Sequence, residues 1–343
     1  MSGMTARRRY GILVRALWSY RRRQTRLGYL PIRLWIEPTN RCNLRCRMCP
    51  QSTPRRAQTP EGMMDFGLFR KIVDEASHFV YDVNLHHTGE ALMHRDFPKM
   101  AKYAKEKGLY TRLHSNATYL SANTAEQIID SGLDLISFSF DGYDKQTYER
   151  IRVNADFKKN LDNIRQFLDI KKRKKSRTPY SIIEVIDIFP DAQEGRAAFQ
   201  AQFDGLPLDQ FIVKRAHNWA GTYGAADETK AVKKAFTCCT FPWYALVIFW
   251  DGRADPCPQD FFGDYPLGDL NKQTIAEIWN GERMISLRER MTAKNVGGII
   301  PCSTCDMLER ESLAGIPTLN LKVFLKENIL GYRKKGLGDR GQG

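Results

Sequence analysis

The chain of 343 residues lacks a long hydrophobic run. No stretch approaches the 18 or more apolar residues that mark a membrane span. The longest apolar run near the N-terminus covers residues 11–14, which is too short for the core of a signal peptide. Hydrophobic residues still make up 42% of the chain and aromatic residues 11%, which suits a protein with a large core. We therefore expect a globular cytoplasmic protein of one or two domains.

Acidic residues are absent from the first 32 positions, which hold eight arginines. A second basic stretch, 322–343, has six Lys or Arg against two acids, so the two ends carry most of the net charge of +14. The N-terminal arm interleaves its arginines with apolar residues, among them Leu13, Leu17 and Trp18, as a basic amphipathic helix would. Such a helix either packs across the barrel described below or contacts an anionic membrane or an acidic partner. No nucleic-acid-binding module is recognised, and no nucleic acid is expected.

Three cysteines, Cys42, Cys46 and Cys49, follow a short apolar run within the segment RLWIEPTNRCNLRCRMCP. No further Cys or His lies nearby in sequence to complete a tetrahedral site. A [4Fe–4S] cube normally takes four thiolates, so three leave one iron open to an outside ligand. An open position distinguishes a catalytic metal site from a structural one. A zinc site completed by a remote ligand, or a chance grouping, is the alternative.

A second cysteine set occupies the C-terminal part of the chain. Its members are Cys239, Cys257, Cys302 and Cys305, with an expected β-hairpin at Asp251-Gly252 and a helix over 274–291 between them. Four thiolates suit either a closed [4Fe–4S] cluster or a zinc site. Cys238 stands beside Cys239 and could replace it as a ligand. The spare thiol is then either buried or a hydrogen-atom donor.

Helix-like and strand-like segments alternate between the two cysteine sets, which predicts parallel strands joined by helical crossovers. Counting the run before the first cysteines gives six strands. In such sheets the chemistry lies at the carboxyl ends of the strands. The expected helices are 66–77, 97–107, 122–131, 155–174 and 194–203, and the strands that follow them are 83–87, 110–115, 135–140, 182–189 and 210–216.

Together these motifs resemble a radical S-adenosylmethionine (SAM) enzyme with a C-terminal SPASM/twitch domain. The resemblance implies an α/β fold with a partial (β/α)6 barrel over 33–235 and a small auxiliary-cluster domain over 236–310 that has a β-hairpin and one helix. The basic arm 1–32 and the tail 311–343 flank them. The implied cofactors are SAM and two [4Fe–4S] clusters, and an implied partner is an electron donor such as flavodoxin or ferredoxin.

The resemblance also implies SAM-binding residues at the strand ends. Gly89 and Glu90 match part of a Gly-Gly-Glu-Pro motif that holds the amino group of SAM, although Thr88 and Ala91 depart from it. Met48 stands where an aromatic residue usually packs on adenine. The expected contacts to ribose and to the methionyl carboxylate come from Ser115, Asn116, Ser139 (or Ser137) and Arg152.

Substrate-facing residues are expected on the last two strands. Glu184 and Asp187 are candidate bases, and because they have opposite facings at most one points into the barrel. Cys238 is a candidate hydrogen-atom donor. Candidate substrate-binding residues are Lys214, Arg215, His217 and Trp219.

The expected reaction is oxidation of a secondary alcohol in a sugar, aminocyclitol or related small molecule, with the auxiliary cluster accepting an electron. Radical epimerisation quenched by Cys238 is one alternative. Maturation of a ribosomally made peptide is another, although the 32 residues before the first strand are few for a winged-helix peptide-binding domain. Outside enzymes, the alternative is a zinc-binding adaptor.

Overall fold

The computed structural model describes residues 6–188, 195–215, 218–219, 236–309, 311–313 and 316–318. Within these residues a sheet of nine strands has the order β6-β5-β4-β3-β2-β1-β7-β8-β9. Strands β1 to β7 pair in parallel, whereas β8 and β9 are antiparallel additions. The strands are β1 (Arg33–Ile36), β2 (Asp82–Asn84), β3 (Tyr110–Ser115), β4 (Leu135–Ser139), β5 (Tyr180–Asp187), β6 (Gln210–Arg215), β7 (Ala245–Ile248), β8 (Arg253–Asp255) and β9 (Gly268–Asp269).

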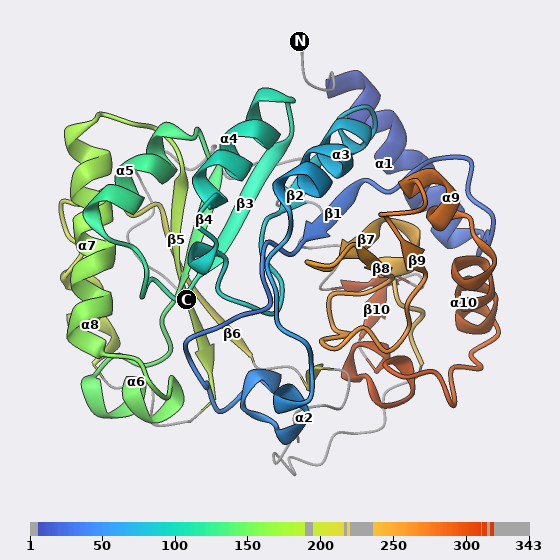
Figure 1. The fold of residues 1–343 in the computed structure, drawn as a ribbon. Helices are drawn as coiled ribbons and strands as arrows, with labels where there is room; N and C mark the ends of the chain where they lie inside the picture. Colours follow the sequence, from blue (N-terminus) through green and yellow to red (C-terminus); the bar gives the residue numbers. More distant parts are fainter. Residues whose placement is uncertain are drawn as a thin grey trace.

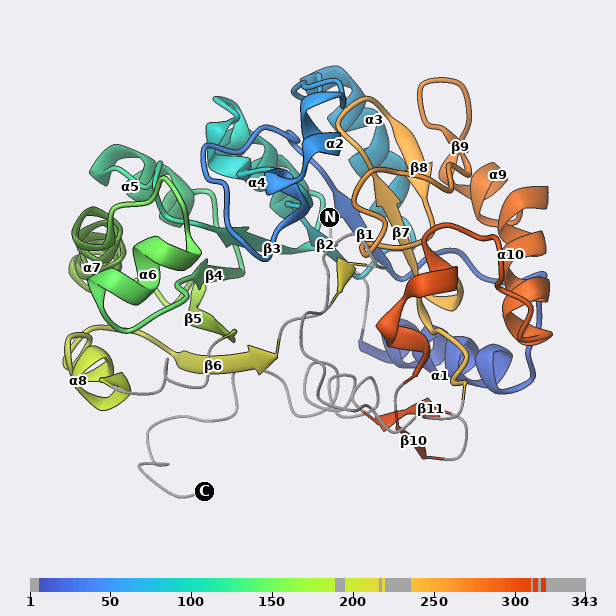
Figure 2. The same ribbon diagram turned by 90° about the horizontal axis from the view of Figure 1, so that it is seen from below.

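Helices cover the outer face of the curved sheet, as the arc of strands in Figure 2 shows. Phe138 of β4 packs edge-on against Phe167 of the longest covering helix, with ring centroids 5.3 Å apart. Polar side chains such as Asp65 and Ser121 cap the first turns of these helices. The helices of this half are α3 (Phe66–Ala76), α4 (Phe97–Glu106), α5 (Ala122–Asp130), α6 (Lys145–Ile151), α7 (Phe157–Arg173) and α8 (Arg196–Ala201), with the short α2 (Pro54–Ala57) near the cysteine loop.

The predicted alternation of helices and strands is confirmed, and the strands form the predicted partial barrel. The second strand differs most, because it ends at Asn84 rather than at His87. Phe97 to Glu106 and Tyr110 to Ser115 match the sequence expectation to within one residue.

The C-terminal part extends the same sheet, because β7 pairs with β1 in parallel and continues into the expected hairpin with β8 (Figure 1). The single helix expected over 274–291 is two helices, α9 (Ile275–Trp279) and α10 (Glu282–Thr292). The break falls at Asn280, whose side chain accepts a hydrogen bond from the backbone N–H of Leu27 at 3.0 Å and donates one to its carbonyl at 2.8 Å. These bonds hold the N-terminal arm against the break.

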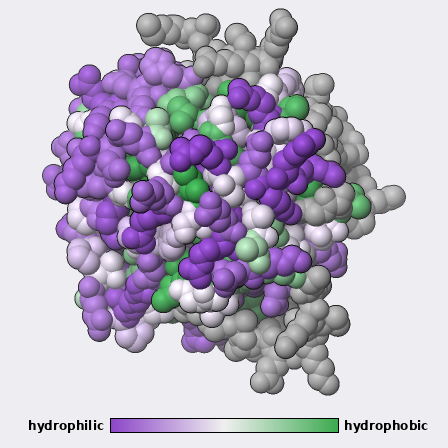
Figure 3. All heavy atoms as spheres, turned by 90° about the vertical axis from the view of Figure 1, so that its right-hand side faces the viewer, coloured by the Kyte–Doolittle hydropathy of each residue, from purple (hydrophilic) through white to green (hydrophobic). Residues whose placement is uncertain are grey.

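The N-terminal arm packs on this C-terminal part rather than across the barrel. Its helix α1 (Ala6–Arg21) places the hydroxyl of Tyr20 2.6 Å from the carbonyl oxygen of Cys238. The hydroxyl of Tyr29 donates to the carbonyl of Trp243 at 2.8 Å, and the backbone carbonyl of Tyr29 accepts from the indole N–H of Trp279 at 2.7 Å. The end of the molecule that carries α9 and α10 is mostly hydrophilic, with scattered apolar residues (Figure 3).

Two short strands, β10 (Ser312–Leu313) and β11 (Ile316–Pro317), form a separate antiparallel pair. None of the helices in the described part of the chain has both the length and the apolar character needed to cross a membrane.

Candidate active site

The first cysteine loop lies at the carboxyl end of β1 and is held by the segment that ends α6. The backbone N–H groups of Arg45 and Arg47 donate to the carbonyls of Val153 and Ile151, at 3.0 and 2.9 Å. Cys46 is buried together with Leu44, Met48 and Ile151 in a small apolar cluster, against which Cys42 and Cys49 pack. The sequence therefore brings the three predicted thiols into one partly enclosed site.

Burial sets the chemistry of these thiols. It raises the pKa of Cys42 to about 12, with a smaller contribution from Glu90, and it raises the pKa of Cys46 and Cys49 as well. Three thiols with raised pKa values in one partly enclosed site need a bound cation to exist as thiolates, and an iron–sulfur cube would supply that positive charge. The residues present thus fit a [4Fe–4S] cluster held by three cysteines.

Two polar side chains approach the sulfur atoms of this loop. The guanidinium of Arg152 lies 3.9 Å from Sγ of Cys46 and 2.6 Å from the carboxylate of Asp141, while the side-chain amide of Asn116 lies 3.9 Å from Sγ of Cys42. N–H groups directed at ligating sulfurs tune the potential of a cluster. Arg152 and Asn116, which were predicted to contact SAM, therefore lie beside the cluster site.

Gly89 and Glu90 lie against the start of the cysteine loop. A Cβ atom at position 89 would come 2.3 Å from the carbonyl oxygen of Thr39 and 2.6 Å from that of Arg41, so only glycine fits. The Glu90 carboxylate accepts hydrogen bonds from the hydroxyl of Ser115 at 2.8 Å and from the backbone N–H of Asn116 at 2.7 Å. Burial raises the pKa of Glu90, and these bonds oppose the rise.

The contacts at Glu90 refine the expectation for Ser115. Its hydroxyl bonds Glu90 in this structure, so Ser115 orients the acid that was predicted to hold the SAM amino group. Ser139 ends β4 in register with Glu184, and Met48 is buried beside Cys46. The SAM contacts of all these residues stay predictions.

A buried hydrogen-bond network around Glu37, which sequence analysis missed, lies next to the first cysteine loop. Glu37, the residue after β1, accepts from both the hydroxyl and the backbone N–H of Thr88, and its second oxygen accepts from the backbone N–H of Trp250 at 3.2 Å. Burial acts to raise the pKa of Glu37, but His87 and Thr88 lower it overall. The sequence signal that could have indicated this network is an acidic residue directly after the apolar run Leu34 to Ile36.

The inner face of the barrel carries a row of polar side chains near the carboxyl ends of β2, β3 and β4. The rings of His86 and His114 lie 4.4 Å apart, and His114 is in register with Ser137. Ser137 faces inward because side chains alternate along a strand and its neighbour Phe138 packs outward on α7. Nδ1 of His86 and Oγ of Ser137 are buried and lack a protein hydrogen-bond partner. We call His86, His114 and Ser137 the inner polar row.

Two of the predicted substrate-facing residues meet beside this row. Lys214 of β6 and Glu184 of β5 form an ion pair with 2.6 Å between Nζ and Oε2. Glu184 is in register with Ser139. Ser139 lies two positions after Ser137 on the same strand, so Glu184 and Ser137 lie on the same face of the sheet. Burial lowers the pKa of His86 well below its usual value, as do the positive charges of His114, His87 and Lys214, whereas Glu184 opposes the shift.

The remaining candidates lie at or beyond the ends of β5 and β6. Asp187 is the last residue of β5 and is in register with Arg215, the last residue of β6. His217 lies outside the described residues. The indole of Trp219 donates to the carbonyl of Met48 at 3.1 Å and packs edge-on against Phe261, with ring centroids 5.6 Å apart. Trp219 therefore joins the first cysteine loop to the C-terminal part of the chain.

The second cysteine set surrounds an apolar cavity. Cys239, Cys257, Cys302 and Cys305 all line it, and its empty space, open mouth included, is about 390 Å³. The backbone N–H of Gln259 lies 3.3 Å from Sγ of Cys257, and burial raises the pKa of Cys302 to about 12. Four partly buried thiols around one apolar space fit a fully ligated cluster.

Cys238 does not line that cavity. Its side chain is buried in the main core, where burial raises its pKa to about 11, and the one partner of its thiol in the described ranges is the carbonyl of Cys239, at 3.8 Å. This placement supports Cys239 as the ligand. Within those same ranges, no three Cys, His, Asp or Glu side chains gather as a site for a single metal ion.

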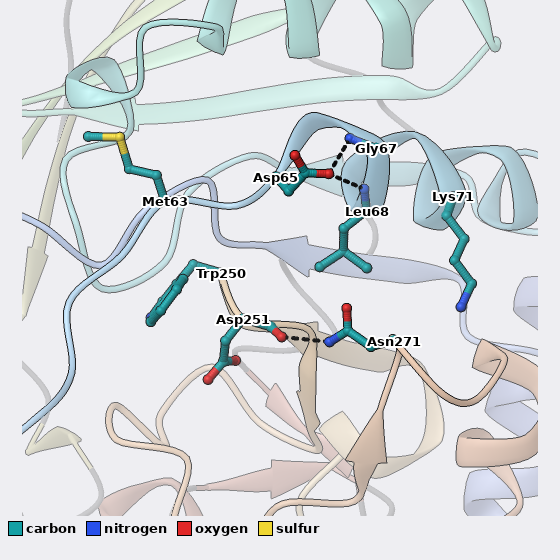
Figure 4. A pocket seen from close by; sticks show the side chains of 8 residues that line it. All are labelled: Met63, Asp65, Gly67, Leu68, Lys71, Trp250, Asp251 and Asn271. Atoms are coloured by element: carbon teal, nitrogen blue, oxygen red, sulfur yellow. Dashed lines mark hydrogen bonds between the residues drawn. The ribbon is translucent and has the colours of Figure 1, made fainter.

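A separate surface pocket lies between the start of α3 and the turn that joins β7 to β8 (Figure 4). Its polar groups already have partners: Asp65 caps α3, Lys71 bonds the carbonyl of Leu270, and Asn271 donates to the carbonyl of Asp251. The pocket contains none of the predicted site residues, so we assign it no part in the chemistry.

Comparison with known proteins agrees with this geometry. Residues 36–187 match the radical SAM superfamily and residues 238–306 match the SPASM iron–sulfur cluster-binding domain. A tungsten-containing aldehyde ferredoxin oxidoreductase cofactor-modifying protein of Pyrococcus furiosus is 25% identical over 73% of this chain and 81% of its own length. The sporulation killing factor maturation protein SkfB of Bacillus subtilis is 25% identical over 84% of this chain and 75% of its own.

A SAM-dependent 2-deoxy-scyllo-inosamine dehydrogenase of Niallia circulans is 22% identical over 79% of this chain and 91% of its own length. Among solved structures, BtrN in complex with AdoMet and 2-DOIA matches 82% of this chain and 94% of its own, with a TM-score of 0.55 at 17% identity. Streptococcus suis SuiB bound to precursor peptide SuiA matches 86% of this chain and 74% of its own, with a TM-score of 0.62 at 12% identity. The chain is therefore a radical SAM enzyme with a C-terminal SPASM domain, and its cofactors are SAM and two [4Fe–4S] clusters.

Proposed function

We propose that this enzyme oxidises a secondary alcohol of a sugar, an aminocyclitol or a related small polyhydroxylated molecule. The observation that carries the proposal is the inner polar row beside the Lys214–Glu184 ion pair, at the barrel end that also holds the first cysteine loop. Buried polar atoms that lack protein partners suit a ligand rich in hydroxyl groups. The resemblance to the inosamine dehydrogenase points the same way.

The reaction needs removal of a carbon-bound hydrogen atom, a hydroxyl proton and one electron. When bound, the first cluster with SAM supplies a 5′-deoxyadenosyl radical, and the second cluster supplies a one-electron acceptor. Cys42, Cys46 and Cys49 hold the first, and Cys239, Cys257, Cys302 and Cys305 hold the second. An external donor such as flavodoxin or ferredoxin provides the electron that starts each turnover.

His86 is the proposed proton acceptor. Its lowered pKa keeps the imidazole neutral at physiological pH, and its buried Nδ1 has no protein partner. Sequence analysis placed the base at Glu184 or Asp187. The ion pair with Lys214 instead favours Glu184 as a binding group, since proton uptake by that carboxylate would break a 2.6 Å contact. The ring of His114 packs against that of His86 in a tilted arrangement.

The position of Cys238 supports oxidation over epimerisation. A thiol that quenches a substrate radical must reach the substrate, whereas Cys238 is buried in the main core next to Tyr20 of α1. Peptide maturation is the competing proposal, since SkfB is a maturation protein and the SuiB structure contains a precursor peptide.

The test incubates anaerobically reconstituted enzyme with SAM, dithionite and a panel of aminocyclitols and sugars. Oxidation predicts a product lighter by two hydrogens and transfer of deuterium from a labelled carbinol carbon into 5′-deoxyadenosine. A product of unchanged mass with one inverted centre would replace the proposal by epimerisation. A product formed only from a co-expressed precursor peptide would replace it by maturation.

His86→Gln separates the role of the base from that of the radical machinery. We expect this variant to form 5′-deoxyadenosine at an unchanged rate without substrate, but to lose alcohol oxidation by roughly 100-fold or more. Ser52→Ala, which removes a hydroxyl beside the cysteine loop, is a matched control for a lost polar contact and should leave the ratio of product to 5′-deoxyadenosine unchanged.

A further inference from the structure

Helix α1 has two apolar faces, of which one packs against the core of the described residues. Leu13, Ala16 and Tyr20 are 7%, 7% and 3% exposed and belong to the main core. Their spacing of three and four residues places them on one side of the helix. This inner face, together with the hydrogen bonds of Leu27 and Tyr29, holds the arm on the C-terminal part of the chain.

The second apolar face points away from the core. Val14 is 64% exposed, Trp18 50%, Tyr10 46% and Leu17 38%. These positions also follow the helical repeat, so they form one continuous stripe, which we call the outer stripe. Half of the eight large apolar residues that are exposed in the described ranges thus lie on a single helix. Such clustering differs from the single apolar residues that are scattered over ordinary protein surfaces.

The charged side chains of the arm that carries the outer stripe have one sign. Arg15 and Arg21 of this helix and Arg22, directly after it, are exposed, and the guanidinium of Arg22 lies 4.8 Å from the ring centre of Trp18. No Asp or Glu occurs among the first 32 residues, which carry eight arginines. A convex helix face that combines Trp, Leu and Val with arginines and no acid is complementary to an anionic, apolar surface.

We propose that the outer stripe docks this enzyme on an anionic phospholipid bilayer, with α1 lying in the interfacial plane. Trp18 and Leu17 insert at the level of the acyl boundary while the flanking arginines contact lipid phosphates. A second copy of the chain is a poorer occupant because the exposed Arg15, Arg21 and Arg22 of the two copies would repel each other. The inner face stays packed during docking, so the hydrogen bonds from Tyr20 to Cys238 and from Tyr29 to Trp243 persist.

The test is co-sedimentation of the reconstituted full-length protein with vesicles of phosphatidylcholine alone or with about a third phosphatidylglycerol. Binding is expected to the anionic vesicles only and to weaken as ionic strength rises. Arg21→Gln with Arg22→Gln should lower affinity roughly 30-fold, because each basic residue near such a surface contributes about one kcal/mol. Leu17→Ser with Trp18→Ser should lower it at least about tenfold.

Matched controls lie on the opposite side of the molecule. Tyr119→Ser removes an aromatic residue of similar exposure, 44%, and Lys158→Gln with Arg173→Gln removes the same charge from α7; both should bind as the wild type does. Unchanged iron content and 5′-deoxyadenosine yield in the α1 variants will show that they are folded. Absence of wild-type binding to anionic vesicles, equal binding by the stripe variant, or stripe-dependent dimerisation in solution would overturn the proposal.

Discussion

The carboxylate of Asp141, at the end of β4, holds the guanidinium of Arg152 at 2.6 Å while the same guanidinium faces Sγ of Cys46 at 3.9 Å. Both side chains of this ion pair are buried. Burial acts to raise the pKa of Asp141, and Arg152 opposes that effect. The pair thereby ties the fourth strand to the first cysteine loop.

Removal of Arg152 should therefore damage both stability and the cluster site. Arg152→Ala leaves a buried carboxylate without its partner, and we expect a loss of about 3–5 kcal/mol in the free energy of unfolding. Urea titration of the anaerobic protein measures it. Arg150→Ala is the control, because that arginine is exposed near the end of α6, the helix that ends directly before Arg152. Its loss should be much smaller, and equal losses for the two variants would contradict the assignment.

Gly89→Ala tests the close approach of the Gly89-Glu90 turn to the cysteine loop. A methyl group 2.3 Å from the carbonyl of Thr39 must push the turn and the loop apart, so SAM binding should fall by at least about tenfold. Isothermal titration of the reconstituted protein measures the affinity. Gly297→Ala, where the added methyl meets no atom within 4 Å, should bind SAM normally.

Paired cysteine variants identify the ligands of the second cluster. Cys239→Ala removes a residue that lines the apolar cavity and should lower iron from about eight to about four per chain. Cys238→Ala removes a thiol outside that cavity and should keep about eight. Iron and sulfide analysis after reconstitution decides between them, and the reverse pattern would make Cys238 the ligand.

A pH dependence follows from His86. Its pKa is lower in the folded state than in the unfolded chain, so protonation favours unfolding. Its contribution to stability is complete above the unfolded value of about 6.5 and falls as the pH drops below it. The unfolding free energy of the wild type should therefore decrease more steeply than that of His86→Gln below that pH. Parallel slopes in chemical denaturation would show that His86 is not buried as a neutral group.

The sequence predicted those parts of the site that depend on local spacing. The cysteine triplet, Gly89-Glu90 and the polar ends of β3 and β4 could be placed because parallel strands bring their carboxyl ends to one edge. The role of Glu37 was not predicted, because its partners, Thr88 and Trp250, are remote in sequence and only the sheet order brings them together. His114 escaped for the same reason, since a histidine inside a strand has no signal until the register pairs it with Ser137.

The C-terminal part shows where local patterns fail. The apolar pattern over 274–291 predicts one helix, but the break at Asn280 depends on hydrogen bonds to Leu27, more than 200 residues earlier. The continuation of the sheet through β7 likewise depends on pairing with β1 rather than on any feature of its own sequence. The periodicity of apolar residues along a helix or strand carries no information about such long-range partners.

Formation of 5′-deoxyadenosine tests the central claim most directly. Anaerobic protein reconstituted with iron and sulfide, given SAM and dithionite, should produce it even without substrate, and chromatography with mass detection measures the yield. Cys46→Ala should abolish the product, whereas Cys238→Ala should retain it. Wild-type protein that carries its iron and never cleaves SAM to 5′-deoxyadenosine would contradict the account.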